Sequence, residues 1–220
     1  SHPRLYAAME QQCRELLFQS NAVALDIRAA AAERLLEVAP DSLQRAFFVN
    51  SGAEANENAL RMACVATGRS RVLAISHGFH GRTAAAGAVT WNSDSWYGFP
   101  HKPLDVDFIP RNDSHTAEQM INEEIAAVIF EPVQGVAGAF DLAPDFLRTL
   151  RDATRRHGAL LIADEVQSGM GRSGEFFAVQ KHAIDPDIMT LAKALGGGIP
   201  CGAVLCSDSV GEHFGSGSLG

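Results

Sequence analysis

The stretch LLIADEVQ, residues 160–167, decides the fold that we expect for this chain. It is a short apolar run that follows Gly158 and ends in two acids, which is typical of a buried strand in a parallel sheet. A carboxylate at the end of such a strand has lost much of its water, which is costly unless a cation or a strong donor meets it. Because side chains alternate across a strand, Asp164 and Glu165 should face opposite sides, and we expect one of them to point at a specific ligand group.

Similar apolar segments recur along the chain and alternate with segments of helical spacing. The expected strands span residues 46–50, 71–76, 106–109, 126–131, 160–164, 187–191 and 202–207. The expected helices span residues 5–18, 26–38 (capped by Asp26), 53–67, 83–89, 116–124, 144–157 and 176–182. This alternation predicts an α/β fold with a mainly parallel seven-stranded sheet and helices on both faces. In such sheets, ligands bind beyond the carboxyl ends of the strands.

Composition excludes several classes of function. The chain has 220 residues and a formal net charge of −8, which argues against nucleic acid as a main partner. No apolar run reaches the length of a transmembrane helix, and no signal peptide opens the sequence. The four cysteines form no CxxC pair and no zinc spacing, so we expect reduced thiols in a cytoplasmic protein. His77 and His80 have no third ligand in range, so we expect no metal.

Polar residues close four of the expected strands, at Asn50-Ser51, Ser76-His77, Glu131 and Asp164. Such residues can simply mark where strands stop. Four of them at one edge of a parallel sheet nevertheless predict a cleft there.

Ser51, Gly52 and Ala53 form a turn between a strand and the start of a helix. Small residues let the backbone approach a ligand, and the free amides of a helix N-terminus favour an anion such as phosphate. A plain helix cap is the simpler alternative. The Walker pattern and the dinucleotide pattern GxGxxG are both absent.

Two further segments carry residues suited to a site. Phe79 lies in a loop, where an aromatic ring suggests that it covers something flat, and Arg82 could clamp a carboxylate. Lys193 follows a strand and has only apolar and small neighbours. A lysine that lacks water loses its proton more readily, which is the condition for Schiff-base chemistry.

Five motifs, taken together and in order, closely resemble the class III aminotransferases that use pyridoxal phosphate, the family of acetylornithine, ornithine and 4-aminobutyrate aminotransferases. The motifs are SGAEANE (51–57), FHGRT (79–83), EPVQG (131–135), DEVQ (164–167) and AKALGGG (192–198). Each motif alone is weak, but the series covers nearly the whole chain.

The resemblance implies a role for each candidate residue. Lys193 would form a Schiff base with the cofactor, and Asp164 would pair with the pyridine nitrogen; these are the two catalytic residues. The other implied roles are phosphate binding by Ser51, Gly52 and Ala53, stacking by Phe79, a hydrogen bond from Gln167 to the ring hydroxyl, substrate-carboxylate binding by Arg82, and a place near the site for Glu131.

The implied reaction moves an amino group from an ornithine- or acetylornithine-like donor to a 2-oxo acid such as 2-oxoglutarate. The family also implies a homodimer. A PLP-dependent aminomutase or racemase of the same fold and an inactive truncated remnant stay open as alternatives.

The chain also departs from the family in two ways. Val136 stands where related enzymes often have Glu, which leaves the amino donor undefined. We further expect a fragment, with an N-terminal helical segment at residues 1–40, a pyridoxal-phosphate-binding large domain at 41–220, and the C-terminal small domain absent.

Overall fold

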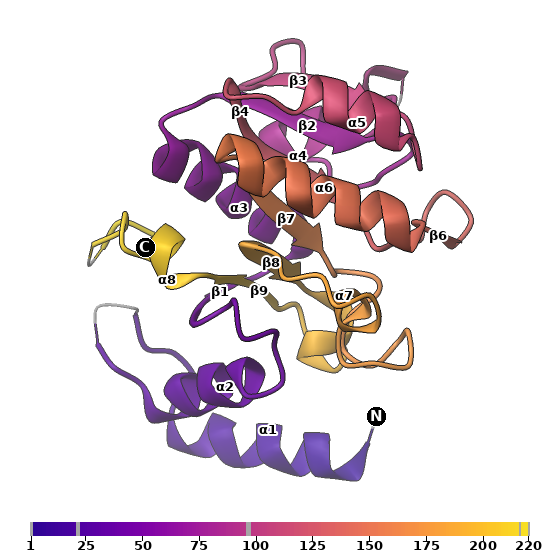
Figure 1. Cartoon of the computed structure of the whole chain (residues 1–220). Coiled ribbons are helices and arrows are strands. Elements are labelled where there is room, and N and C mark those ends of the chain that lie inside the picture. The colour runs from indigo at the N-terminus through magenta and orange to yellow at the C-terminus, as the bar shows by residue number, and fades with distance from the viewer. Residues whose placement is uncertain (1, 21–22, 96–97, 216, 220) are drawn as a thin grey trace.

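The computed structural model describes residues 2–20, 23–95, 98–215 and 217–219. The expected N-terminal segment (1–40) begins at Ser1 and the expected large domain (41–220) ends at Gly220, and both of these residues lie outside the described ranges. The fold has three layers, with a central sheet between helix α3 on one side and helices α5 and α6 on the other (Figure 1).

The sheet has seven strands in the order β1-β9-β8-β7-β4-β2-β3. Their bounds are Arg45–Val49 (β1), Arg71–Ile75 (β2), Asp105–Ile109 (β3), Ile125–Phe130 (β4), Leu160–Asp164 (β7), Ile188–Leu191 (β8) and Gly202–Cys206 (β9). All pairs from β8 to β3 are parallel, whereas β9 is antiparallel to both of its neighbours. The predicted mainly parallel seven-stranded sheet is therefore confirmed, and the reversed direction of β9 is a detail that was not predicted.

The helices flank this sheet and its loops. Their bounds are Pro3–Glu15 (α1), Asp26–Leu36 (α2), Gly52–Thr67 (α3), Ala84–Ala88 (α4), Ser114–Met120 (α5), Pro144–His157 (α6), Ala178–Lys181 (α7) and Asp208–Gly211 (α8), with 3-10 turns at Ser93–Ser95 and Lys193–Gly196. A separate hairpin pairs Val133–Gln134 (β5) with Phe140–Asp141 (β6). Among the described residues, no helix is both long enough and apolar enough to cross a membrane.

Strand β7 divides its side chains between two hydrophobic cores. Leu161 and Ala163 join the core under α6, whereas Ile162 joins the core under α3. The same alternation continues to the strand end, where Asp164 contacts Asn56 of α3 and Glu165 contacts Val179 of α7. The prediction that the two acids face opposite sides is confirmed.

Local sequence explains where the helices beside the site begin and end. Ser51 caps α3, since its hydroxyl accepts the Glu54 amide at 3.1 Å, while the Glu54 carboxylate accepts the Asn50 amide at 2.8 Å. The Ser51 hydroxyl is thus the side-chain cap of α3, and Glu54 also ties the residue before the cap to the first turn. Helix α6 has the predicted bounds, because Pro144 suits its first turn and Gly158 takes the left-handed conformation after its end, with a φ of 65°.

One local prediction was wrong, and one element was not predicted. Asp26 is the first residue of α2 and not its cap, which is Leu25 and offers no side-chain hydrogen bond. The β5–β6 hairpin was not predicted, because strands of two residues carry too little alternation to be seen in the sequence.

Candidate functional site

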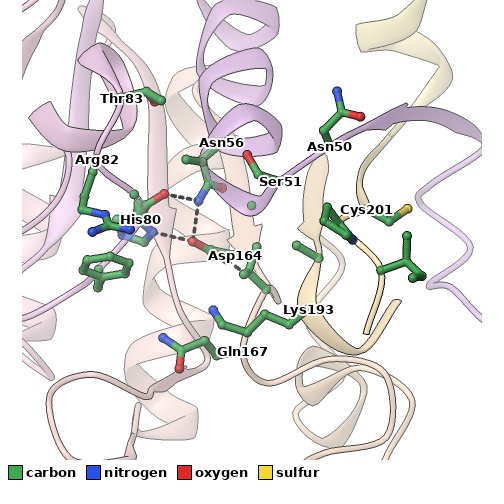
Figure 2. A pocket seen from close by; sticks show the side chains of 18 of the residues that line it. Asn50, Ser51, Asn56, His80, Arg82, Thr83, Asp164, Gln167, Lys193 and Cys201 are labelled. Carbon is green, nitrogen blue, oxygen red and sulfur yellow. Dashed lines mark hydrogen bonds and ion pairs between the residues drawn. The ribbon is translucent and has the colours of Figure 1, made fainter. Parts of the chain in front are cut away.

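A cavity of about 670 Å³ opens at the carboxyl edge of the sheet (Figure 2). Its lining contains all eight residues for which a catalytic, cofactor or substrate role was predicted: Ser51, Gly52, Ala53, Phe79, Arg82, Asp164, Gln167 and Lys193. These residues come from four separate segments of the chain. The fold thus brings the predicted residues together, while their individual roles stay predictions.

The four polar strand ends do not contribute equally. Asn50-Ser51 and Asp164 line the cavity, and Glu131 lies behind it, where it accepts the Phe79 amide at 2.8 Å. Ser76 instead holds the neighbouring loop, because its hydroxyl accepts the Arg111 amide at 2.9 Å. The ring of His77 lies 5.4 Å from that of Trp91, so His77 packs outside the cavity.

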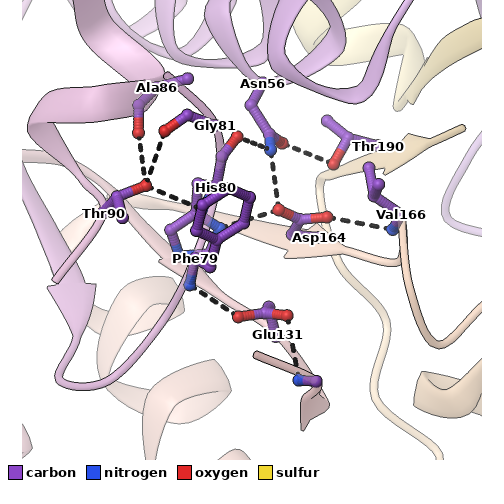
Figure 3. A network of polar contacts seen from close by, with 11 residues as sticks. Asn56, Phe79, His80, Gly81, Ala86, Thr90, Glu131, Asp164, Val166 and Thr190 are labelled. Carbon is purple, nitrogen blue, oxygen red and sulfur yellow. Dashed lines mark hydrogen bonds and ion pairs between the residues drawn. The ribbon is translucent and has the colours of Figure 1, made fainter. Parts of the chain in front are cut away.

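Asp164 is a buried carboxylate, 2% exposed, that accepts three hydrogen bonds (Figure 3). The Val166 amide donates to Oδ1 at 3.0 Å, and Asn56 Nδ2 donates to Oδ2 at 2.7 Å. His80 Nδ1 lies 2.8 Å from the same Oδ2. These donors replace part of the water that the carboxylate loses and fix its orientation toward the cavity.

Asn56 is a site residue for which the sequence analysis predicted no role. Its two amide hydrogens go to Asp164 and to the His80 carbonyl oxygen, the latter at 2.7 Å, while its Oδ1 accepts the Thr190 hydroxyl at 2.6 Å. One side chain therefore joins the loop after β2 to the end of β7 and to β8. The spacing of the helix could have identified it, because Asn56 lies one turn before Leu60 and therefore on the buried face of α3. A polar side chain that is buried in this way needs hydrogen-bond partners.

His80 was considered only as a metal ligand, and the structure shows a different position for it. Its amide donates to the Thr90 hydroxyl at 2.9 Å, and its ring is held against Asp164. A Cβ on Gly78 would lie 2.9 Å from His80 Nε2, so the glycine leaves room for the ring. The buried Nε2 has no hydrogen-bond partner among the residues that the structure describes.

The start of α3 offers an anion-binding end to the cavity. The amides of Gly52 and Ala53 line the opening and make no hydrogen bond within the described part of the chain. Unpaired amides at a helix N-terminus attract anions. A Cβ on Gly52 would lie 2.7 Å from Val166 Cγ1, so only glycine fits this turn.

Lys193 follows β8 in a conformation that a lysine rarely adopts, with a φ of 47°. Such backbone strain is concentrated at functional sites. Its side chain extends toward Asp164 and Gln167 (Figure 2) and has no hydrogen bond or ion pair to any described residue. The cavity therefore contains an unpaired amine together with a buried acid.

Arg82 and Gln167 complete the lining. Arg82 is exposed and has no ion pair with any residue that the structure describes, so its guanidinium is free to meet a carboxylate. Gln167 lies against the backbone of Gly135, where a Cβ would approach its Oε1 to 2.5 Å. A side chain at residue 135 would therefore collide with the amide of Gln167.

Two buried glutamates should make stability depend on pH. Burial raises the pKa of both Glu131 and Glu165 to about 7, from an ordinary value of 4.5. Because the folded-state pKa of each glutamate is raised, its contribution to the stability of the fold is complete at pH values below 4.5. This contribution is lost as the pH rises from 4.5 toward 7. We expect the unfolding free energy of the cofactor-free protein to fall by about 2–3 kcal/mol per glutamate over this range. Urea unfolding at several pH values measures this free energy. Its fall between pH 4.5 and 7 should be smaller in Glu165→Gln than in the parent protein, and an equal fall in both would contradict the prediction.

Comparison with known proteins gives consistent results. The family model described as "Aminotransferase class-III" matches residues 1–220. The acetylornithine aminotransferase of Methanopyrus kandleri is 43% identical over 221 residues, which cover 100% of this chain and 56% of the relative. The enzyme of the same name from Methanosarcina acetivorans is 40% identical over 228 residues, covering 99% of this chain and 57% of the relative.

Solved structures show the same fold. The ornithine aminotransferase of Toxoplasma gondii superposes with a TM-score of 0.91 at 28% identity, covering 99% of this chain and 53% of that one. A PLP-bound amine transaminase from an uncultivated Pseudomonas species gives 0.88 at 30% identity, with 97% and 55% coverage. The chain thus spans about half the length of the relatives that it matches.

Proposed function

The chain belongs to the class III aminotransferase family, and we propose that it forms the cofactor-binding part of a pyridoxal-phosphate-dependent aminotransferase. The reaction would move an amino group from an amino acid or ω-amine, of the ornithine or acetylornithine kind, to a 2-oxo acid such as 2-oxoglutarate. One observation supports this proposal most strongly: the buried carboxylate of Asp164 and the unpaired amine of Lys193 line the same cavity.

The residues present fit pyridoxal phosphate at two separate points, its phosphate and its ring nitrogen. The free amides of Gly52 and Ala53 suit its phosphate, with Ser51 adding a hydroxyl. The carboxylate of Asp164 suits a protonated pyridine nitrogen. When bound, the cofactor supplies an electron sink for the carbon beside the substrate nitrogen.

Asp164 would keep a proton on the ring nitrogen. Its negative charge is held in place by Asn56, His80 and the Val166 amide, so the orientation exists before any ligand arrives. A preoriented charge needs no rearrangement during reaction, which is the condition for strong electrostatic stabilisation.

Lys193 would supply the primary amine that holds the cofactor covalently and would then move protons. With an amino donor in its place, Nζ would be free in the cavity and would carry a proton between the substrate carbon and the cofactor. Its strained backbone keeps the side chain directed into the cavity.

The remaining lining residues would bind and orient. Phe79 would stack on the cofactor ring, and Gln167 would donate a hydrogen bond to the ring hydroxyl, with Gly135 behind it. Arg82 would bind a substrate carboxylate.

We also propose a domain division at residue 40, with an N-terminal helical segment at 1–40 and the large cofactor domain at 41–220. Helix α1 supports it, because none of its residues is buried against the rest of the described chain. The exposed side chains of Leu17 and Phe18 that follow it suit contact with a second copy, as in a homodimer. Four free cysteines agree with a cytoplasmic location.

A donor panel tests the proposed function. Protein supplied with pyridoxal phosphate and 2-oxoglutarate is incubated with acetylornithine, ornithine or 4-aminobutyrate, and glutamate is measured. We expect one glutamate for each donor consumed. Accumulation of a donor isomer or enantiomer without glutamate would identify an aminomutase or racemase instead. Unchanged donors, with no cofactor bound, would contradict the proposal and favour an inactive remnant.

A further inference from the structure

Glu131 occupies a buried position between two loops that form the cofactor cavity. It directly follows β4 and is 1% exposed. Its Oε1 accepts the Phe79 amide at 2.8 Å (Figure 3). Its Oε2 accepts the Gly135 amide at 3.4 Å. One carboxylate therefore joins the loop after β2 to the turn between β5 and β6.

Each of these loops supports one wall of the cavity. Phe79 lines the cavity itself. Gly135 lies behind Gln167, another lining residue, and a Cβ on this glycine would come within 2.8 Å of Gln167 Cδ. The separation of Phe79 and Gln167 thus depends on where Glu131 holds the two backbones.

Glu131 does not itself line the cavity, so its effect on a bound molecule has to act through these neighbours. We propose that Glu131 is a positioning residue whose carboxylate clamps the Phe79 loop to the Gly135 turn and so sets the width of the slot for the cofactor ring. This inference rests on the proposed function only in naming pyridoxal phosphate as the occupant of the slot.

The clamp requires both carboxylate oxygens as acceptors. An ionised carboxylate offers two acceptor oxygens and no donor, whereas an amide presents one oxygen and one NH₂ group. In Glu131→Gln, the NH₂ group has to face one of the two backbone N–H groups. One loop then loses its hydrogen bond, and a buried N–H is left unpaired, which is costly.

The charge of the clamp is sensitive to its surroundings. Burial raises the pKa of Glu131 to about 7, the electrostatic interaction with His80 opposes this shift, and the negative charge of Asp164 adds to it. His80 comes from the Phe79 loop and Asp164 from the end of β7. Below neutral pH, protonation should weaken the clamp.

Glu165 provides a matched control within the same chain. It is also a buried glutamate at a strand end, and burial raises its pKa to about 7 as well. Its carboxylate accepts the Val179 amide at 2.8 Å and the Ser168 hydroxyl, and neither of these residues lines the cavity. The two glutamates differ mainly in their hydrogen-bond donors, which belong to the cavity walls for Glu131 and to residues outside the cavity for Glu165.

Amide hydrogen exchange of the cofactor-free protein tests the clamp directly. In Glu131→Gln, we expect exchange at Phe79 and Gly135 to speed up by roughly tenfold or more, with Val179 unchanged. In Glu165→Gln, we expect faster exchange at Val179 and unchanged exchange at Phe79 and Gly135. Unchanged exchange at Phe79 and Gly135 in Glu131→Gln would overturn the proposal.

Titration with pyridoxal phosphate tests the consequence. Glu131→Gln should bind it roughly tenfold more weakly, and Glu165→Gln should stay within about twofold of the parent. Equal weakening in both variants would mean general damage and would refute a positioning role. Failure of the parent protein to bind would refute the proposed function instead, while the exchange result would still decide the clamp.

A pH comparison replaces the variant if Glu131→Gln does not fold. In Glu165→Gln protein, exchange corrected for its intrinsic pH dependence is compared above and below the Glu131 pKa of about 7. Faster exchange at Phe79 and Gly135 on the acidic side supports the clamp, and no change there refutes it.

Discussion

Replacing Lys193 with alanine is expected to lower the transamination rate by at least about 10⁴-fold. The variant lacks the amine that would hold the cofactor and move the substrate proton, and no other lysine lines the cavity. The rate is measured as glutamate formed from the best donor. Lys193→Arg should be equally inactive, because a guanidinium keeps the positive charge but forms no such link.

Lys181→Ala is the control for this change. Lys181 is the last residue of α7, exposed and outside the cavity. It should retain the parent rate within about twofold, as surface substitutions usually do. A Lys193→Ala variant that kept more than a small fraction of the parent rate would contradict the assignment of Lys193.

Replacing Asp164 with asparagine is expected to lower the rate by about 10²–10⁴-fold. The new NH₂ group would face donors from Asn56 and His80, so the network would rearrange. The negative charge that would hold a proton on the ring nitrogen would also be lost. Single-turnover kinetics with saturating donor measures the effect on chemistry, separate from binding.

Glu165→Gln is the control here as well, since it removes the adjacent buried acid on the opposite side of the sheet. We expect a rate within a few fold of the parent at equal cofactor occupancy. If Asp164→Asn and Glu165→Gln lost activity to the same extent, loss of fold would explain both and the role of Asp164 would be refuted.

The bounds of the elements beside the site could be predicted where residues within the element itself determine them. Helix α6 has its predicted bounds, because Pro144 and Gly158 act within their own turns. The position of Asp164 followed from an apolar strand that ends in acid. The sequence also predicted where strand β9 lies. Its antiparallel direction depends on the path of the chain between Lys193 and Gly202, and hydrophobic periodicity carries no information about that path.

The network around Asp164 shows what sequence reasoning lacked. Asn56 and His80 were both within the motifs, yet their hydrogen bonds to Asp164 span 108 and 84 residues. Thr190 joins through Asn56 from a further strand. Such contacts depend on how β7 and β8 pack against α3, so they become visible only with the fold in hand.

Mapping of the cofactor attachment point tests the central claim most directly. The protein is loaded with pyridoxal phosphate, treated with borohydride to turn a carbonyl–amine link into a stable bond, digested and analysed by mass spectrometry. The chain contains three lysines, Lys102, Lys181 and Lys193. We predict the pyridoxyl group on Lys193. Labelling of Lys102 or Lys181 in its place, or no labelling at all, would contradict the pairing of Lys193 with Asp164 in one cofactor site.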